Sequence, residues 1–213
     1  MNTKDMEITR VNTYQDGRFS EKVLRQHGAF LVNGKPCEVE IISGTEAVIR
    51  GAAQYQKAVI EEFRFYAEHI CKFYDGQGNP VAEYAPVKLF DVPLSAIQPS
   101  QFFVDREKKA AVSTFVHCPG DIVIPLIPKD GRFISLDGHT RLSIAADKGF
   151  TAVGGFLTEG DDWVYAFAAE ANRRGIHSVF DMTELSRQAY EIQWVQFCDQ
   201  FFSSRNAVEK TQE

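Results

Sequence analysis

The residues whose types and spacing most clearly suit binding or catalysis are Asp137-Gly138-His139-Thr140-Arg141. They lie between an apolar run at 133–136 and a helical apolar pattern, so they predict a helix that begins where a strand ends. The first turn of a helix has free backbone N–H groups and the positive end of the helix dipole, and phosphate is the anion usually bound there. Arg141 can add a bidentate hydrogen bond. Gly138, His139, Thr140 and Arg141 are therefore predicted to bind phosphate, with Gly138 leaving room for the ligand because it has no Cβ.

Two side chains of this segment are also candidates for catalysis. Asp137 can hold a metal ion such as Mg²⁺ or orient an acceptor hydroxyl, and His139 can donate a hydrogen bond or carry a proton. A purely structural alternative stays open. In that alternative Asp137 is the N-cap of the helix and takes the free N–H groups for itself, and Arg141 is an ordinary ion-pair partner.

The elements around this segment follow a regular order. We expect extended structure over 90–97, a helix over 105–116, strands over 122–127 and 133–136, a helix over 137–148, a strand over 152–157 and a helix over 163–173. Asp181 and Glu184 form a capping-box pattern that predicts the start of a long final helix. Two apolar stripes on that helix predict packing within its own domain or a homodimer through the helix.

The first half of the chain predicts a separate α+β unit. Ser20 is expected to cap a short helix that ends at Gly28, and β-prone runs at 29–32, 37–42 and 47–50 predict an antiparallel meander. A helix over 54–70 and a hairpin over 72–84 follow. The first ten residues are expected to be loose. We predict an α+β fold with an N-terminal unit at 1–84, a central domain at 85–160, C-terminal helices at 161–205 and a loose tail at 206–213.

Composition limits the class of protein. The chain has 213 residues, a formal net charge of −6, 44% hydrophobic and 24% charged residues, which is ordinary for a globular protein. The acidic balance argues against a dedicated DNA binder or membrane-surface binder. No apolar run reaches the ~20 residues that span a bilayer, and no secretory signal is visible. We therefore expect a cytoplasmic protein without membrane association, whose four cysteines are free thiols.

Residues 89–157 resemble the ParB-like/sulfiredoxin superfamily, in which a turn that ends in arginine begins a helix and binds nucleotide phosphates. The sequence at 137–141 is most similar to free serine kinases of this fold, and Ile97-Gln98-Pro99-Ser100-Gln101 is similar to the first conserved box of the superfamily. The resemblance implies a mixed sheet with helices and a bound nucleotide (ATP, ADP or CTP) with Mg²⁺. It also implies phosphoryl transfer to a small hydroxyl substrate such as a free amino acid. His139 stands where sulfiredoxins have cysteine, so their thiol chemistry is not expected.

The sequence departs from the kinase pattern at one catalytic position. The free serine kinases place a glutamate just after the first-box proline, where this chain has Gln101. Glutamine cannot be a general base, so Gln101 is at most a nucleotide-binding residue. Three alternatives stay open: Asp105 or Glu107 takes the catalytic role, the alignment of the first box is shifted, or the protein is not a kinase.

Three functions stay open. The first is an ATP- or ADP-dependent small-molecule kinase. The second is a nucleotide-binding regulatory module without phosphoryl transfer, with the C-terminal helix as its partner surface. The third is a partition-like DNA-associated protein or nuclease. The acidic balance and the lack of a helix-turn-helix pattern after residue 157 count against this third function.

Overall fold

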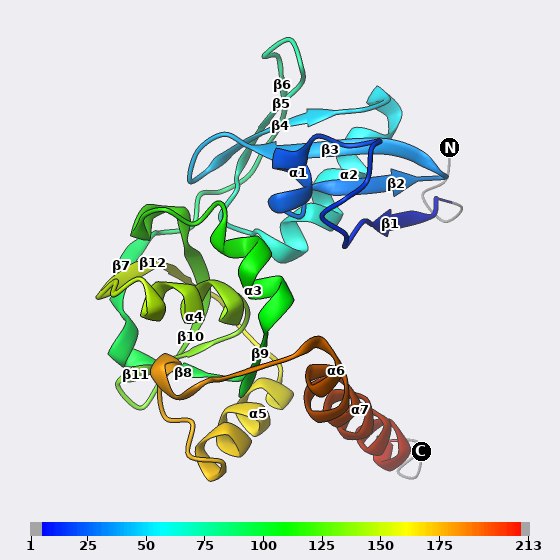
Figure 1. The fold of residues 1–213 in the computed structure, drawn as a ribbon. Coiled ribbons are helices and arrows are strands. Elements are labelled where there is room, and N and C mark those ends of the chain that lie inside the picture. The colour runs from blue at the N-terminus through cyan, green and yellow to red at the C-terminus, as the bar shows by residue number, and fades with distance from the viewer. Residues whose placement is uncertain (1–5, 210–213) are drawn as a thin grey trace. The chain divides into compact units, whose positions relative to one another are not determined.

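The computed structural model describes residues 6–209. The chain divides after Leu89 into two compact units, Met1–Leu89 and Phe90–Glu213, whereas the sequence predicted a boundary after residue 84. Each unit combines helices with a sheet, so the predicted α+β class is confirmed (Figure 1). The C-terminal helices belong to the second unit.

The first unit contains a six-stranded sheet in the order β1-β2-β3-β4-β5-β6. Its strands are β1 (Ile8–Arg10), β2 (Ala29–Val32), β3 (Lys35–Ile41), β4 (Glu46–Arg50), β5 (Lys72–Tyr74) and β6 (Pro80–Glu83). Neighbours are antiparallel except β4 and β5, which are parallel because α2 (Ala53–Tyr66) connects them. The predicted meander and hairpin are present. The prediction of a loose N-terminus was wrong for β1, a three-residue strand whose pairing partner β2 comes much later in the sequence.

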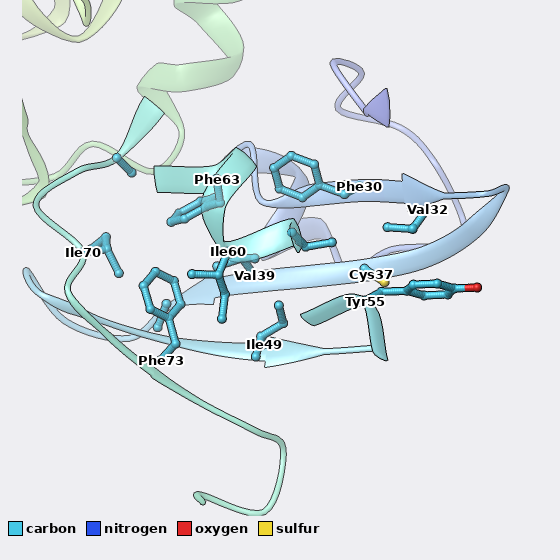
Figure 2. Packing of buried hydrophobic residues seen from close by; sticks show 13 residues of the cluster. Phe30, Val32, Cys37, Val39, Ile49, Tyr55, Ile60, Phe63, Ile70 and Phe73 are labelled. Atoms are coloured by element: carbon cyan, nitrogen blue, oxygen red, sulfur yellow. The ribbon is translucent and has the colours of Figure 1, made fainter. Parts of the chain in front are cut away.

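Each face of this sheet has its own small core. Figure 2 shows α2 packed on one face, where Phe63 lies against Phe30 and Phe73 with ring centroids 6.4 and 6.2 Å apart. On the opposite face lies α1 (Glu21–Arg25), whose buried Val23 and Leu24 pack in a cluster with Ala29. Ser20 caps α1, as predicted, by accepting a hydrogen bond from the backbone of Val23 at 3.3 Å.

The second unit is built on a mixed five-stranded sheet in the order β7-β12-β10-β11-β8. The strands are β7 (Phe90–Pro93), β8 (Ile97–Pro99), β10 (Val123–Lys129), β11 (Arg132–Ser135) and β12 (Ala152–Leu157). The pairs β10–β12 and β11–β8 are parallel, and the pairs β10–β11 and β12–β7 are antiparallel. A separate parallel pair joins β9 (Phe103–Asp105) to β13 (Thr183–Leu185).

Helices cover both faces of this sheet. On one face, α5 (Asp162–Arg173) packs through Val164 and Ala168 against Ile127 and Ile134. Ile124 points to the other face because strand side chains alternate, and there it lies against the start of α4 (His139–Asp147). The neighbouring helix α3 (Arg106–Ser113) lies beside α4 (Figure 1). Among residues 6–209, no helix is both long enough and apolar enough to cross a membrane.

The final helix begins later than the capping-box pattern predicted. The Asp181 carboxylate accepts the backbone N–H groups of His177 and Ser178 at 3.1 and 2.8 Å, and so closes the 3-10 helix η4 (Val179–Asp181). Glu184 lies in strand β13, which pairs with β9, and not in a helix. Ser186 is the actual cap of the helical segment.

This helical segment is continuous. It comprises α6 (Arg187–Tyr190), the π-helical turn η5 (Glu191–Val195) and α7 (Gln196–Glu209). Residues 206–209 are therefore helical and not a loose tail, while residues 1–5 and 210–213 lie outside the described residues.

Much of the apolar surface of these C-terminal helices is buried within the second unit. Trp194 is 9% exposed and packs edge-on against Phe102, with ring centroids 4.8 Å apart. Phe197 and Phe201 pack on Phe167 of α5. We call this group the aromatic cluster; it also contains Trp163, Phe103, Ala171, Ile176, Met182, Tyr190, Val195 and Cys198.

Candidate functional site

The segment at 137–141 forms the predicted strand–turn–helix. Strand β11 ends at Ser135, and α4 begins at His139, two residues later than expected. Gly138 is the N-cap residue, with a positive φ of 83°, and no side chain caps this helix end. Asp137 is therefore not the N-cap, and the first-turn N–H groups of α4 are not taken by a capping side chain.

Gly138 is required by the protein's own packing. A Cβ on this residue would lie 2.3 Å from Cδ1 of Ile124 and 3.1 Å from Nη2 of Arg141. The positive φ is a second reason for glycine, because L-residues with a Cβ rarely adopt it. The glycine therefore allows the turn to pack tightly against β10.

The Arg141 guanidinium is partly bound within the protein and partly accessible to solvent. Its Nη1 donates to the backbone carbonyl of Val123 at 3.2 Å, and its Nη2 lies 3.6 Å from Oδ2 of Asp137. The side chain is nevertheless 28% exposed. The ion pair of the structural alternative is thus present, and a guanidinium with five N–H donors still has capacity for an external anion.

Asp137 is an exposed carboxylate at the mouth of this turn, with 63% of its side chain accessible. Desolvation by the surrounding atoms acts to raise the pKa of Asp137. The charges of Arg141, His139 and Lys108 and the hydrogen bond from the Gly138 N–H outweigh it, so the pKa lies below its usual value. Asp137 is therefore ionised at neutral pH.

His139 lies beneath the turn and does not face solvent. It is 6% exposed, and its Nε2 accepts a hydrogen bond from the backbone N–H of Ser100 at 3.2 Å and lies 3.1 Å from the Ser135 hydroxyl. Burial first, then Lys108 and Arg141, lower the pKa of His139 to about 4, although Asp137 opposes the shift. The imidazole is neutral at pH 7 and joins α4 to the ends of β8 and β11. Thr140 is also buried, at 8% exposure.

Lys108 is a site residue that the sequence analysis missed. It lies on the first turn of α3, a helix that packs beside α4, and its positive charge lowers the pKa of both Asp137 and His139. The signal was available only indirectly: Asp105 is a good N-cap residue, and a residue three positions after a cap lies in the first helical turn. Nothing in the sequence indicates that this turn lies beside α4.

The structure places Gln101 and the two candidates for the catalytic base, Asp105 and Glu107, in different environments. Asp105 is 2% exposed, caps α3 by accepting the N–H groups of Glu107 and Lys108, and pairs with Arg187 at 2.8 Å. The Gln101 amide donates to the Phe103 carbonyl and to the Tyr190 hydroxyl, the latter at 3.2 Å. Glu107 is exposed on the first turn of α3. The C-terminal segment contacts both Asp105, through Arg187, and Gln101, through Tyr190. Of the two carboxylates, Glu107 is the accessible one.

A magnesium ion fits this site only in part. Among residues 6–209, no group of three or more His, Cys, Asp or Glu side chains gathers where it could hold a metal ion. Mg²⁺ is commonly held by one or two carboxylates together with substrate phosphates. Asp137 is ionised and exposed, so it can supply one such ligand when a polyphosphate supplies the others.

Comparison with known proteins adds little to this description. No protein-family model and no curated protein matches the chain. Among solved structures, the crystal structure of protein Atu1540 from Agrobacterium tumefaciens matches with 16% sequence identity and a TM-score of 0.32. The match covers 47% of this chain and 64% of that chain. At this level of similarity it assigns neither a fold family nor a function.

Proposed function

We propose that this protein binds a nucleotide through its phosphates at the N-terminus of α4. The observation that carries the proposal is the helix end itself: Gly138 is its N-cap, no side chain caps it, and Arg141 contributes a partly exposed guanidinium beside it. Backbone N–H groups and a guanidinium together are the usual protein partners of a phosphate. The resemblance of residues 89–157 to the ParB-like/sulfiredoxin superfamily supports the nucleotide as the class of ligand.

In this proposal each residue has a distinct role. The N–H groups of His139, Thr140 and Arg141 face the phosphate oxygens, while Arg141 and Lys108 neutralise their charge. His139 is a positioning residue, because its imidazole is buried and neutral. Asp137 holds Mg²⁺ together with the phosphates. When bound, Mg²⁺ supplies further charge neutralisation and orients the phosphates.

The geometry favours binding over phosphoryl transfer. A kinase of this type needs a carboxylate that accepts the proton of the acceptor hydroxyl. Asp105 is buried, caps α3 and pairs with Arg187, and Gln101 carries no charge. We therefore propose a nucleotide-binding regulatory module as the main function. A small-molecule kinase with Glu107 as its base is the second candidate, because that carboxylate is exposed beside Lys108.

The first test measures ligand binding by thermal unfolding with pyrophosphate, ATP, ADP and CTP, each with and without Mg²⁺. A ligand at one hundred times its Kd should stabilise the fold by about 2.7 kcal/mol. Arg141→Ala and Lys108→Ala should each remove most of that increment. Arg173→Ala is the matched control, since Arg173 is 77% exposed and pairs only locally with Glu170. No stabilisation by any of these ligands would refute the proposal.

A second test separates the module from the kinase. The protein is incubated with ATP or ADP, Mg²⁺ and a panel of hydroxyl amino acids, and products are read by mass spectrometry. Binding without product in the wild type favours the module. Product that disappears in Glu107→Gln favours the kinase. If only Gln101→Glu forms product, the site derives from a kinase that has lost its base.

A further inference from the structure

The C-terminal segment is attached to the start of α3 by a set of polar contacts. Strand β13 pairs in parallel with β9, and the backbone N–H of Thr183 donates to the carbonyl of Phe102 at 3.1 Å. Glu184 pairs with Arg106 at 2.8 Å and with Lys109 at 3.2 Å. These contacts join two parts of the second unit that are far apart in sequence.

One of these contacts involves a buried charge. Asp105 is 2% exposed, and Nη1 of Arg187 lies 2.8 Å from its Oδ2. Its Oδ1 accepts the backbone N–H groups of Glu107 and Lys108 at 2.9 and 3.3 Å. A buried carboxylate needs charge compensation as well as hydrogen bonds. Arg187 supplies that compensation, so the conformation of the first turn of α3 depends on a residue of α6.

An ion pair also links the N-terminal part of α3 to α4. Lys109, which is 13% exposed, lies 2.6 Å from Oδ2 of Asp147 near the end of α4. Lys108 precedes it on a helix that packs beside α4, and its charge acts on Asp137 and His139 at the start of α4. A shift of the Asp105 cap would therefore move Lys108 relative to the N-terminus of α4.

We propose that Arg187 is a positioning residue for the phosphate site: by compensating the Asp105 carboxylate, it fixes the first turn of α3 and the place of Lys108 beside the N-terminus of α4. This inference rests on the proposed function of that site. Coupling between two sites is reciprocal. A phosphate ligand must therefore also strengthen the docking of the C-terminal helices.

The first experiment measures pyrophosphate binding to the full chain by calorimetry, well below the unfolding midpoint of every variant. Arg187→Ala should weaken binding about tenfold, within the usual range of coupling between sites. Arg187→Lys should restore part of it, because it keeps the charge. The matched control is Glu191→Gln, which removes the other ion-pair partner of Arg187 and leaves the contact with Asp105 intact. It should bind like the wild type.

The second experiment reads the C-terminal helices directly. The two tryptophans of the chain, Trp163 and Trp194, lie in the aromatic cluster and not in the phosphate site. Their fluorescence therefore reports on the packing of the C-terminal helices. Pyrophosphate should change their fluorescence emission in the wild type and in Glu191→Gln, and not in Arg187→Ala. A residue that only stabilises the fold would leave this ligand response unchanged.

The outcomes separate the two proposals. If pyrophosphate and nucleotides do not bind the wild type, the proposed function fails and the inference fails with it. If they bind the wild type and Arg187→Ala equally well, or leave the wild-type tryptophan emission unchanged, the proposed function stands and the role of Arg187 is refuted. The wild-type fluorescence result holds even if Arg187→Ala does not fold.

Discussion

The backbone N–H of Ser100 donates a hydrogen bond to Nε2 of His139 over 3.2 Å. Since this N–H can only donate, Nε2 must accept, and the proton of the neutral ring lies on Nδ1. A proton on Nε2 would break this contact and place a charge in a buried position. The pKa of His139 accordingly falls to about 4, with burial as the main cause.

This pKa predicts how stability depends on pH. The folded pKa of His139 lies below the ordinary value of 6.5, so the unfolded chain binds more protons between the two values. Stability should therefore fall as pH falls from about 6.5, and the His139 contribution should level off below about 4, with a loss on the order of 2 kcal/mol by pH 4.5. Denaturant unfolding at pH 7 and pH 4.5 measures it.

The control for this prediction is His139→Gln, which removes the titrating group. Its stability should change less than that of the wild type over the same pH interval, which lies above the unfolded pKa values of most carboxylates. Equal pH dependence in both proteins would show that His139 does not contribute.

Gly138→Ala should destabilise the protein more than Gly149→Ala. Both glycines have a positive φ, 83° and 70°, but a Cβ at Gly138 meets Ile124 at 2.3 Å whereas a Cβ at Gly149 has nothing within 4 Å. The backbone conformation alone costs about 1–2 kcal/mol at either position. The clash should add roughly 1–3 kcal/mol at Gly138. Urea midpoints measure the difference, and adding Ile124→Val, which removes the clashing methyl, should recover part of it.

Arg141→Ala should have a small effect on the ligand-free protein. The lost hydrogen bond to the Val123 carbonyl costs about 1 kcal/mol, and the ion pair with the exposed Asp137 contributes little. The unfolding midpoint should fall by about 2–4 °C for a chain of this size. A much larger loss in the absence of ligand would make Arg141 a structural residue first, and would favour the alternative in which the turn binds no phosphate.

Trp194→Ala should be among the most destabilising changes in the second unit. The indole is 9% exposed and contacts Phe102, Phe167 and Phe197. Removing a buried aromatic side chain costs about 3–5 kcal/mol. Ile192→Glu is the comparison, because Ile192 lies on the same helical segment but is 54% exposed, and it should leave the unfolding midpoint nearly unchanged.

The same Ile192→Glu variant tests the homodimer proposed from the sequence. Light scattering on the wild type gives the oligomeric state. If the wild type is a dimer and Ile192→Glu is a monomer, the exposed side of the C-terminal helices is the interface. If both are monomers, burial within the aromatic cluster accounts for the apolar stripes of these helices.

The sequence by itself predicted the local structure well. Ser20 as a cap, the run 29–32 as a strand, the hairpin at 72–84 and the strand–turn–helix at 133–148 all depend on residues within a few positions of one another. Hydrophobic periodicity and capping are short-range signals, so they can be read without the fold. The final helix shows the limit of such signals. The pattern at Asp181 and Glu184 matches a capping box, but pairing of β13 with β9 outweighed it.

The character of the candidate site was decided by the tertiary structure. The sequence predicted a phosphate-binding turn at Asp137, Gly138 and Arg141. It could not show that Ile124 fills the space beside Gly138 or that the Ser100 N–H donates to Nε2 of His139. It also suggested Asp105 as a general base, whereas the buried Asp105 carboxylate pairs with Arg187, 82 residues later. Charge, burial and hydrogen-bond partners depend on neighbours in space. A residue's type determines which chemistry it can do, and the packing around it decides which part of that chemistry remains available.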